Sequence, residues 1–220
     1  FYISALIFLL TSFIIGERSN FIKVFIIISI FIFLINKQNY FKKISILIVF
    51  TMLSSLIIFG NEFFKSRFVE EIFLPLKEKG ISKFVAETKH GLHFEIAKNI
   101  FKQNATFGIG IKNFRNESKN IKYHSTRTLD QGIANHPHQI HLEFLSETGL
   151  IGYIIFLFFF LYSIFYGLKL FFKNRNIFAL SSSLFLFATF LPLLPSGSFF
   201  TSYSATIFWI NYSFLITKNE

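Results

Sequence analysis

The sequence predicts an all-α membrane protein that crosses the bilayer several times, and its composition carries much of this prediction. Of its 220 residues, 52% are hydrophobic and 20% aromatic, including 35 phenylalanines, whereas only 15% are charged. A soluble domain carries about 25% charged residues, so this chain has too little polar surface to stay in water. The apolar residues also gather into runs approaching the roughly 20 residues that a helix needs to cross the hydrocarbon core.

Six apolar runs are candidates for membrane spans. They are residues 1–15, 21–35, 44–60, 150–172, 177–194 and 201–216. We therefore expect transmembrane helices in residues 1–60, a helical loop domain in residues 61–148 and further transmembrane helices in residues 149–220. Because the chain begins with Phe1 inside an apolar run and without an initiator methionine, we also expect it to be a piece of a longer protein.

The distribution of basic residues predicts how the chain is oriented, since cytoplasmic loops are enriched in lysine and arginine. The turns after the second and fourth runs are basic, whereas the turns at residues 16–20 and 195–200 contain only Arg18 between them. The carboxy terminus is then cytoplasmic, and residues 61–148 lie on the opposite face. Because the basic excess follows this topology and no basic stripe with interleaved aromatic residues occurs, we expect no nucleic-acid partner.

The residue types available limit the chemistry of the external segment. The chain has no cysteine, which excludes disulfides, thiolate nucleophiles and cysteine metal sites. All the histidines fall within residues 61–148, and they are His90, His93, His124, His136, His138 and His141. Apolar residues at three-and-four spacing predict one amphipathic helix over residues 81–103. Pro137 suits the first helical position, so we expect a second helix to begin there and run into the fourth span.

Three interpretations of the histidines around Pro137 remain open from their spacing alone. They could form a polar helix start at the lipid interface, where histidine is common. A metal site could use His136, His138 and His141, because three imidazoles can bind zinc. Alternatively, one of these histidines could bind substrate or act in catalysis, since free N–H groups at a helix start attract phosphate.

The order of motifs along the chain resembles the O-antigen ligase and O-antigen polymerase superfamily. His136-Pro-His-Gln-Ile-His-Leu-Glu-Phe-Leu-Ser-Glu-Thr-Gly-Leu-Ile-Gly152 resembles its histidine motif before the last spans. Gly16-Glu-Arg-Ser19 resembles its Ser-x-Arg turn, and the segment from Phe107 to Phe114, followed by Arg115, resembles its Gly-x-Gly-x-x-x-Phe segment. The chain departs from the family where Gln139 replaces an asparagine and where Lys89 or His90 stands in place of an arginine.

The resemblance implies an inner-membrane enzyme with a periplasmic loop domain that moves a glycan from an undecaprenyl diphosphate carrier to an acceptor. Its expected partners are the lipid-linked glycan donor, a glycan, lipid or protein acceptor, and membrane lipids. No cofactor and no metal are expected, because the diphosphate is already a good leaving group. The identity of the acceptor stays open, and the alternative class is a transporter subunit with a solute-binding external loop.

The resemblance also implies roles for particular residues. His138 would be the catalytic base, and Arg18 and Arg115 would bind the diphosphate. His136, His141 and Glu147 would support the site, with Glu143 or Glu147 orienting a histidine. The alternatives are an interfacial Arg18 neutralised by Glu17 and an Arg115 that is merely solvated.

Overall fold

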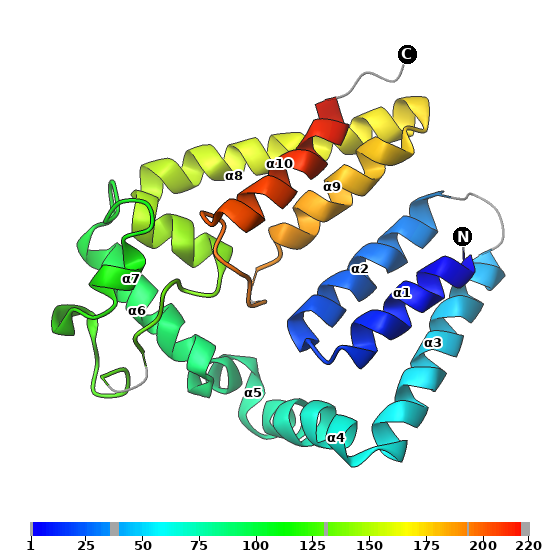
Figure 1. Cartoon of the computed structure of the whole chain (residues 1–220), viewed down its shortest axis with the longest axis horizontal. Coiled ribbons are helices and arrows are strands. Elements are labelled where there is room, and N and C mark those ends of the chain that lie inside the picture. The colour runs from blue at the N-terminus through cyan, green and yellow to red at the C-terminus, as the bar shows by residue number, and fades with distance from the viewer. Residues whose placement is uncertain (1, 36–39, 130–131, 193, 217–220) are drawn as a thin grey trace. The chain divides into compact units, whose positions relative to one another are not determined.

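The computed structural model describes residues 2–35, 40–129, 132–192 and 194–216, and no strand occurs among them. Figure 1 shows helices joined by turns and loops, so the prediction of an all-α fold is confirmed. The chain divides into two compact units, Phe1–Phe84 and Val85–Glu220. Two parts of the predicted topology, residues 36–39 of a basic turn and the tail at residues 217–220, lie outside the described residues.

The first unit contains apolar helices followed by a chain of short helical segments. In order, these are α1 (Tyr2–Ile14), α2 (Arg18–Ile35), α3 (Tyr40–Gly60), α4 (Glu62–Lys65), a π-helix (Ser66–Phe73) and the first part of α5 (Leu74–Glu87). The buried ring of Phe13 stacks on Phe64 and Phe68, with centroids 5.3 and 5.0 Å apart. Other large apolar side chains, such as Phe41 at 87% exposure, cover the outside, as lipid-facing residues do.

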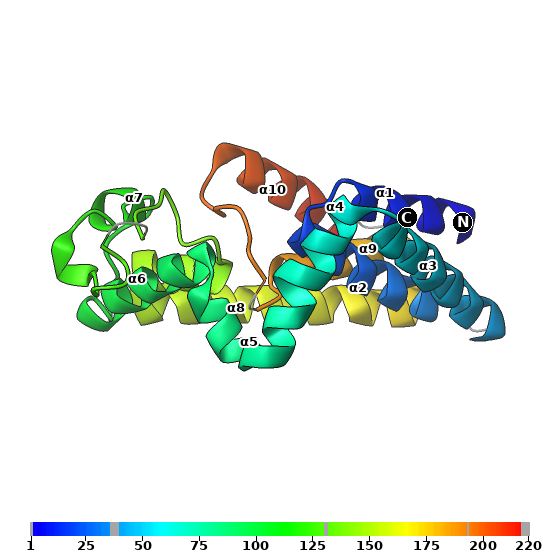
Figure 2. The same ribbon diagram turned by 90° about the horizontal axis from the view of Figure 1, so that it is seen from below.

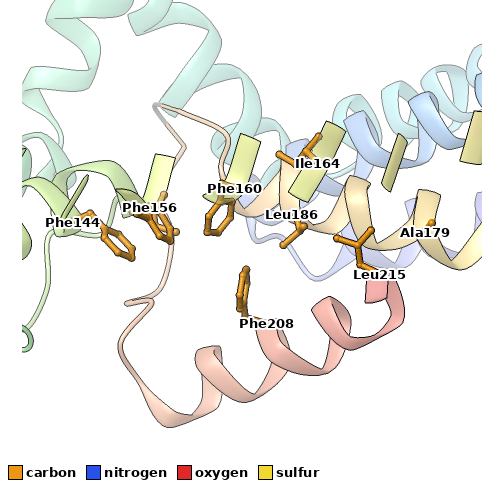
Figure 3. Close-up of a cluster of buried hydrophobic side chains, with 9 residues drawn as sticks. Phe144, Phe156, Phe160, Ile164, Ala179, Leu186, Phe208 and Leu215 are labelled. Atoms are coloured by element: carbon orange, nitrogen blue, oxygen red, sulfur yellow. The ribbon is translucent and has the colours of Figure 1, made fainter. Parts of the chain in front are cut away.

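The second unit joins a small loop-rich part to three apolar helices. Its elements are α6 (Lys89–Gln103), α7 (Phe114–Glu117), a 3-10 turn (Ile121–Tyr123), α8 (Ile140–Asn174), α9 (Ile177–Thr189) and α10 (Ser202–Ile216). Helix α9 packs against both α8 and α10 (Figures 1 and 2). Phenylalanines of α8 meet Leu186 of α9 and Phe208 of α10 in the buried cluster of Figure 3.

The structure supports the membrane prediction helix by helix. Among the described residues, α2, α3 and α8 are long and apolar enough to cross a membrane, whereas Ile3–Ile14 and α9 are apolar but shorter. Every predicted run therefore contains a helix, and the number of crossings stays a prediction. The boundary between the two compact units, at Phe84 and Val85, falls inside residues 61–148. That these residues form one loop domain outside the membrane therefore stays a prediction.

Two helix boundaries differ from the sequence prediction. The expected single helix over residues 81–103 is interrupted at Thr88, which caps α6 by accepting a hydrogen bond from the Gly91 N–H at 3.0 Å. The expected helix start at Pro137 is also wrong. Helix α8 begins three residues later, because His138 is left-handed (φ 58°) and Gln139 caps the helix by accepting from the Leu142 N–H at 2.8 Å.

Candidate functional site

Four histidines meet at one end of the second unit, and His138 lies at their centre. The centroid of its ring is 4.0 Å from that of His136, 4.9 Å from that of His90 and 5.1 Å from that of His93. Two of these residues come from α6 and two from the loop before α8. The polar atoms of this group can therefore act on one bound molecule.

The backbone of the loop before α8 is fixed around His138. Pro137 is buried, and the Ser196 N–H donates to the His138 carbonyl oxygen at 2.8 Å. The left-handed conformation of His138 is uncommon for a residue with a side chain and persists only where the surroundings hold it. The turn after α9 therefore helps to set the direction of the His138 side chain.

The environment of the cluster keeps its central imidazole uncharged. Burial, together with the neighbouring His136, His90 and His93, lowers the pKa of His138 to about 4. Burial also lowers the pKa of His136, against the hydrogen bond that its ring makes with the Ser196 backbone. At neutral pH the lone pair of His138 is available to accept a proton or bind a cation.

His141 lies outside this cluster and has a structural role. Its Nε2 donates to the Phe190 carbonyl oxygen at 2.9 Å, and its Nδ1 is 3.0 Å from the Tyr153 hydroxyl. Because a carbonyl only accepts, the neutral ring carries its hydrogen on Nε2 and accepts from Tyr153. The Nε2 bond thus joins α8 to the end of α9, whereas the Nδ1 bond lies within α8, and the supporting role expected of His141 stays a prediction.

Glu143 fastens the turn after α9 to α8. Its carboxylate accepts hydrogen bonds from the Ser198 hydroxyl and from the Phe199 N–H, the latter at 2.8 Å, although only 2% of the residue is exposed. The same turn carries Ser196, which holds the His138 carbonyl. Glu143 therefore positions the histidine loop through this turn, and its side-chain hydrogen bonds to the described residues go to Ser198 and Phe199 and not to a histidine.

Burial raises the pKa of Glu143 to about 7, while its bonds to Ser198 and Phe199 act in the opposite direction. The folded state therefore binds more protons than the unfolded state between about pH 4.5 and pH 7, so this group contributes stability at low pH that is lost as the pH rises. The contribution of one such group to the free energy of unfolding changes by up to about 1.4 kcal/mol per pH unit within this range. We expect Glu143→Gln to remove this contribution and so to make the stability less dependent on pH. Thermal unfolding of both proteins in detergent at pH 5.5 and 8.0 measures it, and identical pH slopes would contradict the assignment.

Glu147 binds the glycine segment. Its carboxylate oxygens accept from the Lys112 N–H at 2.6 Å and the Phe114 N–H at 3.1 Å, at the start of α7. These hydrogen bonds hold the backbone of the glycine segment, whereas the predicted role of Glu147 was to orient a histidine. The sequence missed this role because a glutamate on a helix before a span is usually exposed, whereas Glu147 is 2% exposed.

Two glycines make this attachment a close fit of backbone against backbone. Helix α8 breaks at Gly149 (φ 66°, ψ −169°), and the segment around Gly108 (φ 69°) lies in the break. The Ile109 N–H donates to the Ser146 carbonyl at 3.0 Å, and the Leu150 N–H donates to the Ala105 carbonyl at 2.7 Å. The backbone around Gly108 is therefore bonded to α8 on both sides of Gly149, and we call this contact the interlock.

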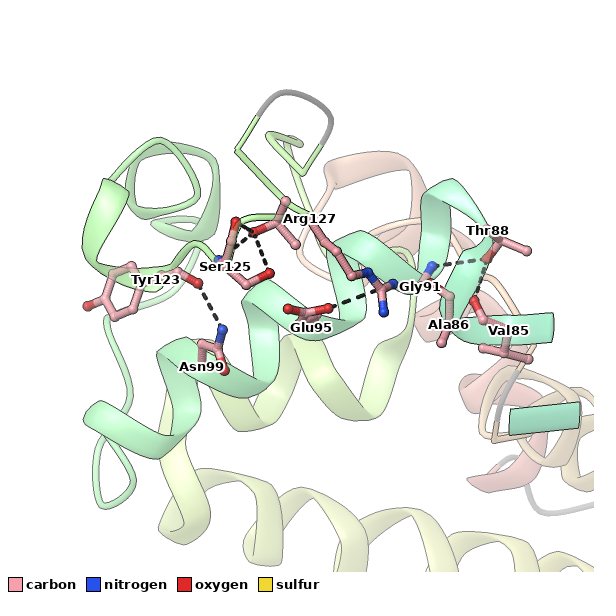
Figure 4. Close-up of polar contacts among 10 residues, drawn as sticks. Val85, Ala86, Thr88, Gly91, Glu95, Asn99, Tyr123, Ser125 and Arg127 are labelled. Carbon is pink, nitrogen blue, oxygen red and sulfur yellow. Dashed lines mark hydrogen bonds and ion pairs between the residues drawn. The ribbon is translucent and has the colours of Figure 1, made fainter. Parts of the chain in front are cut away.

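Helix α6 is held in place by its own cap and by the loop that follows α7 (Figure 4). The Arg127 guanidinium donates to the Ala86 carbonyl at 2.7 Å and lies 3.9 Å from a carboxylate oxygen of Glu95. The Asn99 side-chain amide donates to the Tyr123 carbonyl at 2.9 Å. These contacts fix the helix that presents His90 and His93.

Among the described residues, no hydrogen bond or ion pair joins Arg18 or Arg115, the two predicted arginines, to the histidine cluster. Arg18 belongs to the first unit, where its Nη1 donates to Glu71 at 2.8 Å and to the Arg67 carbonyl at 3.2 Å. Its acidic partner is thus Glu71, whereas the alternative interpretation of Arg18 named Glu17. Arg115 lies on α7 with an exposed side chain.

Sequence reasoning missed His90 and His93 as members of the site. The signal was present, because residues three apart lie on the same face of a helix. The pair belongs to the amphipathic pattern of residues 81–103, and nothing in the local sequence connects His93 with His136, which lies 43 residues further along the chain.

Comparisons with known proteins agree with the order of these features along the chain. A family model described as O-antigen ligase matches residues 3–157, more than two thirds of the chain. The matched region includes the start of α2, the glycine segment and the histidine loop. No curated protein and no solved structure matches the chain.

Proposed function

Because the chain belongs to the O-antigen ligase family, we propose that it transfers a glycan from an undecaprenyl diphosphate carrier to an acceptor at the outer face of the inner membrane. The family is one of glycosyl-transferring membrane enzymes of ligase or polymerase type, and the apolar helices agree with a multi-pass membrane protein. The basic turns of the sequence favour residues 61–148 on the periplasmic face. Labelling of a single cysteine at Lys119, which is exposed, by an impermeant thiol reagent in intact cells tests this orientation, and protection would contradict it.

One observation supports the histidine cluster as the place of transfer. The Nε2 of His136 and the hydroxyl of Ser196 are buried, and neither has a hydrogen-bond partner among the described residues. Leaving a buried polar atom unpaired costs about 1–3 kcal/mol, and a bound substrate that pairs with these atoms would remove that cost. Both belong to segments that contact or hold His138.

In the proposed reaction, the acceptor group attacks the anomeric carbon of the glycan while the bond from that carbon to the diphosphate oxygen breaks. His138 takes the proton that the acceptor loses. The carrier diphosphate leaves with the electron pair of the broken bond, and its growing charge is stabilised by guanidinium groups. The negative diphosphate beside His138 also favours the protonated imidazole, which strengthens this base when substrate is bound.

Arg18 and Arg115 are the proposed binding groups for the diphosphate. A guanidinium matches two phosphate oxygens in a forked arrangement, which an ammonium group does not reproduce. Arg115 is exposed and follows the glycine segment that Glu147 fixes. Arg18 is held by Glu71, which limits its conformational freedom before substrate arrives.

The activity itself is tested with purified protein, a lipid-linked diphosphate glycan and an acceptor preparation of cell-envelope glycolipid. We expect the glycan to appear on the acceptor while the lipid diphosphate is released. Movement of a solute across proteoliposomes without any glycan transfer would favour a transporter and contradict the proposal.

We expect Arg18→Lys to weaken donor binding and to lower turnover, each by about 10-fold or more, because one positive charge is kept while the fork is lost. The change in kcat and KM for the donor measures both effects. Glu71→Gln is the matched control, since it removes the partner and keeps the guanidinium. Unchanged kinetics of Arg18→Lys would remove Arg18 from the site.

A further inference from the structure

A metal-binding constellation lies inside the histidine cluster. Nitrogen atoms of His90, His93 and His138 all lie within 4.8 Å of one another. We propose that these three imidazoles bind one divalent transition-metal ion, with Zn²⁺ the best fit, and that the bound ion inhibits glycan transfer. The site shares only His138 with the one that sequence spacing suggests. His90 and His93 stand in place of His136 and His141, and both ring nitrogens of His141 are bonded elsewhere.

The geometry needs only small adjustments to hold an ion. Zinc binds imidazole nitrogen at about 2.0–2.1 Å, which places nitrogens of a tetrahedral site roughly 3.3 Å apart. His90 and His93 project from the same face of α6, so rotation about their side-chain bonds moves both towards a common point. Three protein ligands with one open position are the usual arrangement of a zinc site that also binds water or substrate.

The donor set selects the kind of ion. All three ligands are imidazoles, whereas the two carboxylates of α8, Glu143 and Glu147, are occupied by Ser198, Phe199 and the glycine segment. Imidazole suits Zn²⁺, Cu²⁺ and Ni²⁺, while Mg²⁺ and Ca²⁺ require oxygen ligands. The site should therefore discriminate against the abundant hard cations.

The surrounding structure holds the ligands before an ion arrives. The Thr88 cap fixes the first turn of α6, and a Cβ on Gly91 would lie 2.1 Å from the Val85 carbonyl, so the helix start is tightly packed there. The carbonyl of His138 is bound by the Ser196 N–H. Ligands that are already ordered lose less conformational entropy on binding, which strengthens the site.

The inhibitory effect rests on the proposed function. A metal ion uses the same lone pair of His138 that accepts the proton from the acceptor group. Bound metal and base catalysis by His138 are then mutually exclusive, and the ion acts as a reversible inhibitor. No bond of the substrate is made or broken by this ion.

Metal binding is tested without any reference to activity. Full-length protein without a histidine tag is titrated in detergent with Co²⁺, whose visible absorption reports tetrahedral nitrogen coordination, and Zn²⁺ is then added as competitor. We expect one ion per chain, and an affinity at least about 100-fold lower in His93→Ala, beyond the 10-fold to 100-fold typical of lost outer contacts. His124→Gln, outside the cluster, is the control and should bind normally. Absence of the cobalt spectrum, or equal binding by His93→Ala, would overturn the site.

Inhibition is tested in the transfer assay with Zn²⁺ and with a chelator, each variant being compared with its own metal-free rate. We expect Zn²⁺ to lower the rate of the wild-type protein, the chelator to restore it, and His93→Ala to need at least about 100-fold more Zn²⁺. A transfer rate that rises with Zn²⁺, or that stays the same when Zn²⁺ is bound, would overturn the inhibitory role. Failure of transfer with every donor would contradict the proposed function, while the cobalt titration would still decide the metal site.

Discussion

Replacing His138 is expected to lower the turnover of glycan transfer by about 100-fold to 10,000-fold, the usual contribution of acid–base catalysis. The substitution removes the base and leaves the proposed diphosphate-binding arginines in place, so the affinity for the donor should change little. Both His138→Ala and His138→Asn are informative. Asparagine tolerates the left-handed backbone found at this position, so it removes the imidazole with less strain.

Initial rates and KM for the donor are measured at matched amounts of folded protein. His124→Gln is the control, because His124 holds its own loop through the Ser118 and Thr128 carbonyls and lies outside the cluster. Full activity in both His138 variants would show that another group accepts the proton. His136, whose Nε2 is buried without a partner among the described residues, would then be tested next.

Gly108→Ala is expected to destabilise the second unit by at least about 3 kcal/mol, more than almost any other single change there. A Cβ at this position would lie 2.4 Å from the carbonyl carbon of Glu147 and 2.6 Å from the Gly149 nitrogen. Both neighbours are backbone atoms in the break of α8, so they cannot move aside as a side chain could. The glycine segment should then separate from α8 and carry Arg115 with it.

Gly110→Ala is the matched control for this change. Gly110 is also left-handed (φ 95°), but a Cβ there would meet no heavy atom within 4 Å. Its cost should be limited to backbone strain of about 1–2 kcal/mol. At about 2–4 °C per kcal/mol for a chain of this size, the two variants should differ clearly in their unfolding temperatures in detergent. Equal unfolding temperatures would contradict the interlock.

The all-helical fold could be predicted from the sequence because length and hydrophobicity of an apolar run are local properties. The ends of helices could not, because they depend on contacts made after folding. Pro137 suits a helix start, yet the left-handed His138 and the Gln139 cap delay the helix to Ile140. The Thr88 cap in the same way divides what the apolar periodicity presents as one helix.

The candidate site was only partly predictable for a related reason. His136 and His138 are neighbours in sequence, so their proximity follows from their spacing. His90 and His93 join them only through tertiary packing of α6 against α8 within the second unit. The resemblance located the glycine and glutamate motifs correctly, but only the structure explains them, since Glu147 binds the backbone of the segment that contains Gly108.

If His138 serves as a base, glycan transfer is a single displacement at the anomeric carbon. A single displacement inverts the configuration of that carbon, whereas a covalent intermediate on a protein side chain gives retention after two inversions. The direct measurement is therefore the anomeric configuration of the new glycosidic bond, read by NMR from the coupling of its anomeric proton and compared with that of the lipid-linked donor. We expect inversion of configuration. Retention of configuration would contradict it and would indicate a nucleophile in place of a base.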